Sequence, residues 1–230
     1  MGKEYKNYIF DLYGTLLESD GDEKSAQNWK KWLSVLDKKG IKHPDYIAFR
    51  KEFFCMDKEL REEYKEKYGY SFPEIDVIDI YRFLFEKYGN GTLSDELLNE
   101  LSFDFRTATT KWMRLYEGVE EYLNKLHKEG KNVYILSNAQ HSYTYPEILK
   151  FGLDKLTDDQ LMSSDFKCMK PETSFYDALF KKHNLKREES VMIGDSIWSD
   201  INGAIAYGID YIHLQGDNDP HKFYLRQMDL

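Results

Sequence analysis

Short apolar runs alternate with amphipathic segments through most of the chain. The apolar runs are too short for helices and rich in strand-favouring residues, so they predict strands over residues 7–10, 133–136, 190–195 and 210–215. Apolar positions spaced three and four apart predict helices over residues 117–130, 171–185 and 199–208. Strands that alternate with helices indicate an α/β fold, a doubly wound parallel sheet with helices on both faces.

Residues 18–114 break this alternation and carry helical patterns instead. One helical face holds Trp29, Trp32, Leu33 and Leu36. Residues 76–89 form a second amphipathic stretch, and no strand of comparable quality is apparent in this part of the chain. We therefore expect an α/β core over residues 1–17 and 115–230 and a helical insertion over residues 18–114, whose aromatic residues pack in a core rather than bind a cofactor.

Composition and charge narrow the classes of function. The 230 residues are 41% apolar and 32% charged, which indicates a globular protein, and the net charge of −9 without a dense basic run disfavours nucleic-acid partners. No run of about 18 apolar residues is present, so we expect no membrane span. Cys55 and Cys168 lack metal-ligand spacing, which favours two free thiols in the cytoplasm.

Polar residues follow three of the predicted strands, where ligands bind in open α/β sheets. Asp11 follows the first strand, Ser137 and Asn138 follow the second, and Asp195 follows the third. Asp200 comes five residues after Asp195, and Lys170 lies in a loop before another predicted helix.

Each of these residues has an ordinary explanation when taken singly. Asp11 can cap a turn, Asp195 and Asp200 can cap a helix, and Lys170 can be a solvated side chain. Taken together, carboxylates that converge at one sheet edge repel each other unless a cation lies among them. Oxygen ligands of this kind suit Mg²⁺, which commonly binds one or two carboxylates and a phosphate.

Four segments in this order resemble the motifs of the haloacid dehalogenase superfamily of hydrolases: FDLYGTL, ILSN, MKPE and IGDSIWSD. The resemblance implies a Rossmann-like core with a helical cap in the place of the insertion. It implies that Asp11 is the nucleophile, that Ser137 holds a substrate oxygen and that Lys170 stabilises the charged intermediate. Asp195 and Asp200 would then form the acidic, metal-binding motif.

The substrate and metal contacts follow from the same resemblance. The expected substrate-binding residues are Tyr13, Gly14, Thr15, Ser137, Asn138 and Lys170. The expected Mg²⁺ ligands are Asp11, the backbone carbonyl of Tyr13, and Asp195, with Asp200 close by. The partner implied is a small phosphorylated molecule.

Tyr13 departs from the phosphatase pattern, in which the residue two after the nucleophile is usually a second Asp that acts as acid and base. A tyrosine with an ordinary pKa near ~10 is a poor base at neutral pH. Tyr13 is instead similar to the 2-haloacid dehalogenase branch, whereas Asp195 and Ile197 stand where that branch has Ser and Asn. Three interpretations stay open: a Mg²⁺-dependent phosphatase, a 2-haloacid dehalogenase, and a binding protein of little or no activity.

Overall fold

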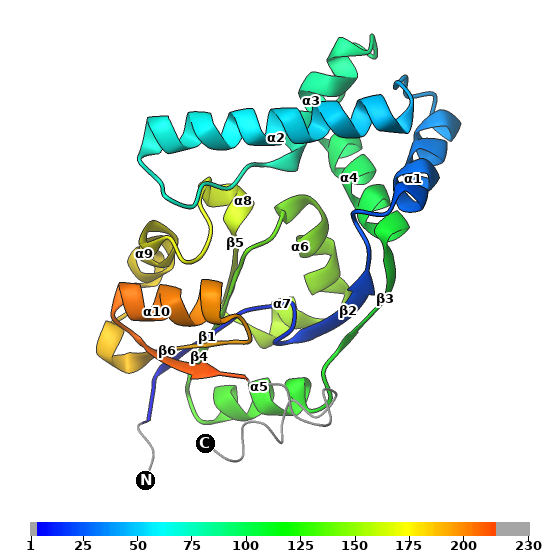
Figure 1. Cartoon of the computed structure of the whole chain (residues 1–230). Coiled ribbons are helices and arrows are strands. Elements are labelled where there is room, and N and C mark those ends of the chain that lie inside the picture. Colours follow the sequence, from blue (N-terminus) through cyan, green and yellow to red (C-terminus); the bar gives the residue numbers. More distant parts are fainter. Residues whose placement is uncertain (1–3, 215–230) are drawn as a thin grey trace.

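A five-stranded parallel sheet forms the centre of the computed structural model, which describes residues 4–214 (Figure 1). Its strand order is β5-β4-β1-β6-β7. The strands are β1 (Asn7–Phe10), β4 (Asn132–Ser137), β5 (Asp159–Met162), β6 (Ser190–Gly194) and β7 (Asp210–His213). The four predicted strands are confirmed; β5 was not predicted, because its first half is polar and only its last two residues are buried.

Helices cover both faces of this sheet, as the doubly wound prediction requires. Phe10 packs on one face with Leu123 and Ile148, whereas its neighbour Ile9 packs on the other with Phe175 and Ala204. The first face carries α5 (Val119–Lys128), α6 (His141–Lys150) and α7 (Leu153–Leu156). The second carries α9 (Thr173–His183) and α10 (Asn202–Tyr207).

Three short elements lie in the connections of the core. They are α8 (Ser163–Phe166), a 3₁₀ turn (Arg187–Glu189) and a π-helical turn (Ile197–Ile201). The π turn leads directly into α10, so the helix predicted over residues 199–208 begins with a wider turn than expected.

Four helices form a second unit above the carboxyl ends of the strands (Figure 1). They are α1 (Ala26–Lys38), α2 (Tyr46–Tyr68), α3 (Val77–Lys87) and α4 (Asp95–Thr109). These helices share an aromatic core, in which the rings of Trp32 and Phe105 lie 5.2 Å apart. Trp32 also donates to the carbonyl of Leu101 at 2.9 Å, so its indole N–H is satisfied although the ring is fully buried.

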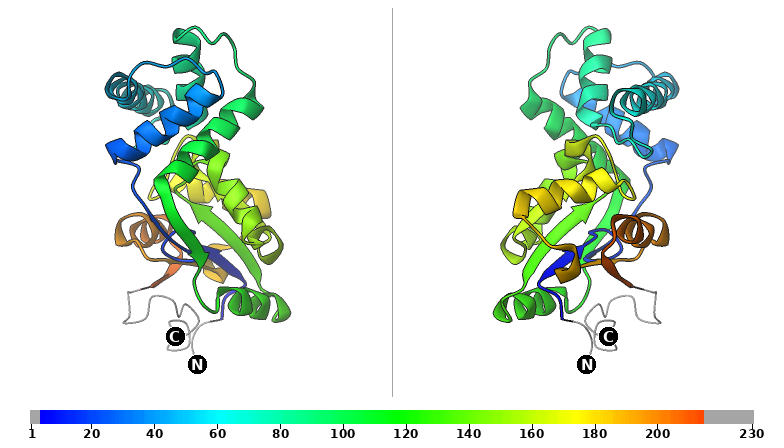
Figure 2. Two further views of the ribbon diagram at one scale, coloured as in Figure 1. Left: turned by 90° about the vertical axis from the view of Figure 1, so that its right-hand side faces the viewer. Right: turned by 90° about the vertical axis from the view of Figure 1, so that its left-hand side faces the viewer.

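Two strands connect the helical unit to the core (Figure 2). β2 (Leu17–Gly21) and β3 (Thr110–Leu115) pair antiparallel, so the expectation that residues 18–114 lack strands was wrong at both ends of the insertion. These two strands were not predicted because they carry charged side chains in place of an apolar run. Arg114 donates to Glu18 at 2.8 Å, and Lys111 donates to Asp20 at 3.0 Å.

Two further expectations concern the whole chain. Cys55 is exposed and Cys168 is buried, and both are free thiols. Within residues 4–214, no helix combines the length and the apolar character that a membrane crossing demands. Residues 215–230, which we expected to belong to the core, lie outside the described residues.

Helix α3 offers a matched pair of substitutions that tests the helical core. Phe85 is fully buried and Phe83 is 53% exposed on the same helix. We expect Phe85→Ala to lower the free energy of unfolding by about 3 to 5 kcal/mol, because it leaves a cavity among packed rings. Phe83→Ala should change it by less than about 0.5 kcal/mol. Urea titration checks both, and equal losses would contradict the packing described.

Candidate functional site

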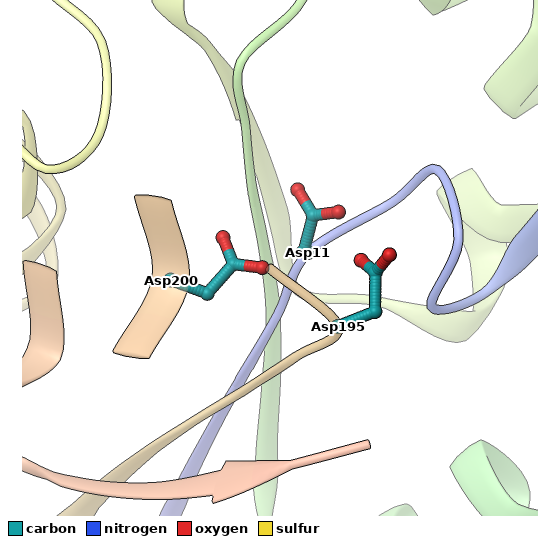
Figure 3. Close-up of side chains that lie close together, drawn as sticks. All are labelled: Asp11, Asp195 and Asp200. Atoms are coloured by element: carbon teal, nitrogen blue, oxygen red, sulfur yellow. The ribbon is translucent and has the colours of Figure 1, made fainter. Parts of the chain in front are cut away.

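The ends of two neighbouring strands, β1 and β6, bring the predicted carboxylates together. Asp11 follows β1, Asp195 follows β6, and Asp200 lies in the π turn after it. Their side chains point toward one another (Figure 3), and one oxygen from each lies within 4.8 Å of the others. Ser137 ends β4, the strand on the other side of β1, and is buried. The sheet order thus gathers residues from both ends of the chain.

Lys170 neutralises part of this cluster from within. Its ammonium lies 2.7 Å from Oδ1 of Asp11 and 2.7 Å from Oδ1 of Asp200. The lysine side chain is fully buried, so solvent does not screen either pair. Burial lowers the pKa of Lys170, but the attraction of Asp11 and Asp200 outweighs burial and raises that pKa above its ordinary value.

The electrostatic state of Asp11 reflects the same crowding. Burial raises the pKa of the Asp11 carboxyl to about 6, although Lys170 acts in the opposite direction. Repulsion from Asp200 and Asp195 adds to the increase. One buried ammonium therefore does not balance the negative charge of three converging carboxylates, and a bound cation would reduce the remaining repulsion.

Asp195 forms the open side of the cluster. Its side chain is exposed, and the hydroxyl of Thr15 donates to its Oδ1 at 3.4 Å. Gly14 has a φ of +81°, and a Cβ at that position would lie 2.5 Å from Oδ2 of Asp195. Glycine is required here for both its conformation and its lack of a side chain. The predicted residues Gly14 and Thr15 thus line the approach to Asp195.

Asp200 is held more firmly than Asp195. The backbone N–H of Ser196 donates to its Oδ2 at 3.0 Å, and the hydroxyl of Ser199 donates to its Oδ1 at 3.2 Å. Both carboxylate oxygens of Asp200 therefore have hydrogen-bond partners, and Oδ1 also pairs with Lys170. Asp200 orients Lys170, whereas Asp195 is the more accessible of the two carboxylates.

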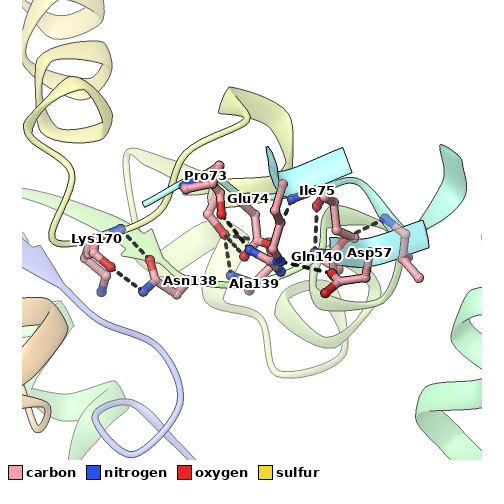
Figure 4. A network of polar contacts seen from close by, with 11 residues as sticks. Asp57, Pro73, Glu74, Ile75, Asn138, Ala139, Gln140 and Lys170 are labelled. Carbon is pink, nitrogen blue, oxygen red and sulfur yellow. Dashed lines mark hydrogen bonds and ion pairs between the residues drawn. The ribbon is translucent and has the colours of Figure 1, made fainter. Parts of the chain in front are cut away.

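Asn138 contacts the peptide of Lys170 (Figure 4). Its amide nitrogen donates to the Lys170 carbonyl at 2.9 Å, and its Oδ1 accepts from the Lys170 N–H at 2.7 Å. Both polar groups of the Asn138 side chain therefore bond to the peptide of Lys170, and the substrate contact expected from Asn138 stays a prediction.

A segment between α2 and α3, residues 72–76, attaches the helical unit to the same loops. The carbonyl of Phe72 accepts from Met169 at 3.0 Å, directly before Lys170. The side chain of Gln140 donates to the carbonyl of Ile75 at 2.9 Å (Figure 4). Residues on both sides of the site, after β4 and before α9, are therefore fixed to the helices.

Glu74 is the charged centre of this attachment, and the sequence pattern did not predict it. Its carboxylate is buried and accepts from Arg61 at 2.7 Å and from Ser163 at 3.2 Å. Burial raises the pKa of Glu74, while the Arg61 guanidinium opposes that increase. Nothing in the local sequence distinguishes Glu74 or Arg61 from the many solvated charges around them.

Tyr13 makes its side-chain contacts with α6 and α4. Its phenol donates to Oε2 of Glu147 and lies 3.0 Å from the hydroxyl of Thr144, both on α6. The guanidinium of Arg106, on α4, stacks over the Tyr13 ring at 5.0 Å and donates to Oε1 of Glu147 at 2.8 Å. Burial and the Glu147 charge raise the pKa of Tyr13 well above its usual value. These three partners lie far along the chain, and no sequence signal identified them.

Comparisons with known proteins match most of the chain. The family model described as haloacid dehalogenase-like hydrolase matches residues 5–208. The glyceraldehyde 3-phosphate phosphatase of Pyrococcus furiosus is 28% identical over 220 residues, which cover 90% of this chain and 79% of that protein.

Two solved structures share the fold. A HAD phosphatase from Thermococcus onnurineus has a TM-score of 0.56 and 21% identity, over 93% of this chain and 88% of that one. The L-2-haloacid dehalogenase of Xanthobacter autotrophicus, with chloropropionic acid covalently bound, has a TM-score of 0.53 and 14% identity, over 94% and 80%.

The buried pair of Glu74 and Arg61 provides a test of the attachment. We expect Glu74→Gln to lower the free energy of unfolding by about 2 to 3 kcal/mol, because it leaves the guanidinium without its buried counter-charge. Glu52, which pairs with Lys87 on the more exposed face of α2, is the control, and Glu52→Gln should cost at most about 1 kcal/mol. Urea titration of both variants decides, and equal losses would argue against Glu74 as the anchor.

Proposed function

Because the chain belongs to the haloacid dehalogenase-like hydrolase family, and is therefore a hydrolase, we propose that it is a Mg²⁺-dependent phosphatase of small phosphorylated molecules. The observation that carries the proposal is the convergence of Asp11, Asp195 and Asp200. A further carboxylate beside the nucleophile adds electrostatic repulsion to the site, and a bound metal cation offsets that repulsion. The similarity to the glyceraldehyde 3-phosphate phosphatase of Pyrococcus furiosus supports phosphatase chemistry without fixing the substrate.

The residues at the site fit the proposed cation. Asp11, the backbone carbonyl of Tyr13 and Asp195 would hold Mg²⁺, with Asp200 close by, and all four offer the hard oxygen ligands that this ion prefers. When bound, Mg²⁺ would offset the repulsion between the carboxylates and an incoming phosphate.

Asp11 is the proposed nucleophile. Its carboxylate oxygen bonds to phosphorus as the bond from phosphorus to the leaving oxygen breaks, which yields an aspartyl phosphate. Water then attacks phosphorus as the bond to Asp11 breaks, which restores the carboxylate; phosphate leaves with the oxygen of the water, and one water proton passes to solvent. Lys170 holds the Asp11 carboxylate in place through its ion pair, and Ser137 and Thr15 are the proposed contacts of the phosphate oxygens.

The helical unit is the proposed selector of the substrate. We assign residues 18–114 to a cap and residues 1–17 and 115–230 to the catalytic core. The position of α1–α4 above the strand ends supports this division (Figure 1), as does their separate aromatic core. The free, exposed thiol of Cys55 is consistent with the cytoplasmic location that we propose.

A 2-haloacid dehalogenase is the second candidate, and Tyr13 is the observation that favours it. The Tyr13 phenol is engaged with Glu147 and Thr144, and a halide leaves without needing a proton. Asp195 argues against this candidate, because it adds a carboxylate to a site whose nucleophile is already crowded by Asp200.

The phosphatase activity is tested with p-nitrophenyl phosphate. We expect hydrolysis with Mg²⁺, none in chelator, and a loss of at least about a thousandfold in Asp11→Asn, because the variant lacks the nucleophile. The control Asp37→Asn changes an exposed carboxylate on α1 and should keep the full rate. Turnover in chelator, or an undiminished rate in Asp11→Asn, would refute the proposal.

Halide release tests the second candidate. We expect no halide from L-2-chloropropionate or its bromo analogue, with or without chelator, because the proposed cation is what offsets the repulsion of the converging carboxylates around Asp11. Ion chromatography of the reaction mixture measures the product. Release that depends on Asp11 and persists in chelator would establish the dehalogenase instead.

A further inference from the structure

The proton of the Tyr13 phenol is committed to a buried network. The phenol donates to Glu147, whose side chain is only 6% exposed, and its oxygen lies 3.0 Å from the Thr144 hydroxyl. Arg106 covers the face of the ring and holds the other oxygen of Glu147 at 2.8 Å. The network therefore fixes both the position of the ring and the direction of its hydroxyl.

Release of the phenol from this network is unfavourable. A rotation of Tyr13 toward Asp11 would remove the hydrogen bond to a buried carboxylate and leave Glu147 with Arg106 alone. An unsatisfied buried group of this kind costs about 1 to 3 kcal/mol, and more when it is charged. The network therefore favours the observed position of the Tyr13 phenol beside α6.

The charged groups that shift the pKa of Asp11 are each engaged in other interactions. They are Lys170, Asp200 and Asp195. Lys170 is bonded to both Asp11 and Asp200, and its ammonium is needed there to neutralise the buried carboxylates. Asp200 accepts hydrogen bonds at both oxygens, and Asp195 is a proposed ligand of the cation.

We propose that this site cleaves phosphate from acidic oxygens, those of phenols, enols and carboxylic acids, and discriminates against phosphate esters of ordinary alcohols. The inference rests on the proposed phosphatase function and adds the class of substrate. Asp11 bonds to phosphorus, the bond to the leaving oxygen breaks, and the electron pair departs with that oxygen as a phenolate, enolate or carboxylate. These anions are stable without a proton, whereas an alkoxide is not.

The expected size of the discrimination follows from general acid catalysis. A positioned acid contributes about 10² to 10⁴ in rate when the leaving group needs a proton. A site without that acid loses this factor for alcohol esters and keeps its rate for esters of acidic oxygens. The quantity to compare is kcat/KM, because it covers the steps up to the transfer of the phosphoryl group to Asp11.

Phenyl phosphate and benzyl phosphate form a matched pair for the test, since they differ by one methylene and the ring is the same. With Mg²⁺, we expect kcat/KM to fall from p-nitrophenyl to phenyl to benzyl phosphate, by at least about a hundredfold over the series. Tyr13→Phe should leave the ratios between these substrates unchanged, because the phenol does not supply the proton. Tyr13→Asp should raise the benzyl rate relative to the p-nitrophenyl rate by about tenfold or more.

The outcomes separate this inference from the function on which it rests. Absence of Mg²⁺-dependent and Asp11-dependent hydrolysis of p-nitrophenyl phosphate would overturn both. Hydrolysis that depends on Asp11 but proceeds equally well with benzyl and p-nitrophenyl phosphate would overturn the substrate class alone. A benzyl rate that collapses selectively in Tyr13→Phe would do the same, because it would identify the phenol as the acid.

Discussion

The ammonium of Lys170, buried between Asp11 and Asp200, is the interaction on which the site depends. Each of its two ion pairs is 2.7 Å long, and the lysine side chain has no exposure to solvent. A buried charge is tolerated only with close partners, so β1, β6 and the loop before α9 must be assembled together. The third carboxylate, Asp195, exceeds what one lysine can neutralise, and this excess of negative charge underlies the proposed Mg²⁺ site.

The helical unit is joined to this charge cluster at two places. Residues 72–76 bond to the loop that carries Lys170, with the buried pair of Glu74 and Arg61 behind them. Arg106 stacks on Tyr13, two residues after Asp11. The residue at which the first motif departs from the phosphatase pattern thus serves to connect the core with α4. A structural role of this kind accounts for an aromatic ring at a position beside the proposed nucleophile.

Much of the fold and the acidic cluster could be predicted from the sequence, because both follow local rules. Buried strands are apolar runs, and polar residues after parallel strands meet at one edge, which placed Asp11 and Asp195. The strands β2 and β3 were not predicted, because their side chains form ion pairs and do not show an apolar run. The partners of Tyr13 and the pair of Glu74 and Arg61 are long-range contacts between ordinary polar residues, and no periodicity encodes such contacts.

The covalent role of Asp11 is the central claim, and mass spectrometry of the enzyme stopped by acid during turnover tests it most directly. The protein is mixed with p-nitrophenyl phosphate and Mg²⁺, quenched with acid within the first turnovers and digested with pepsin at low pH, where an aspartyl phosphate survives, and the peptide that contains Asp11 is analysed. If Asp11 is the nucleophile, this peptide gains the mass of one phosphoryl group, and fragmentation places that group on Asp11. Phosphate release without any modified peptide, or a phosphoryl group on another residue, would contradict this role of Asp11.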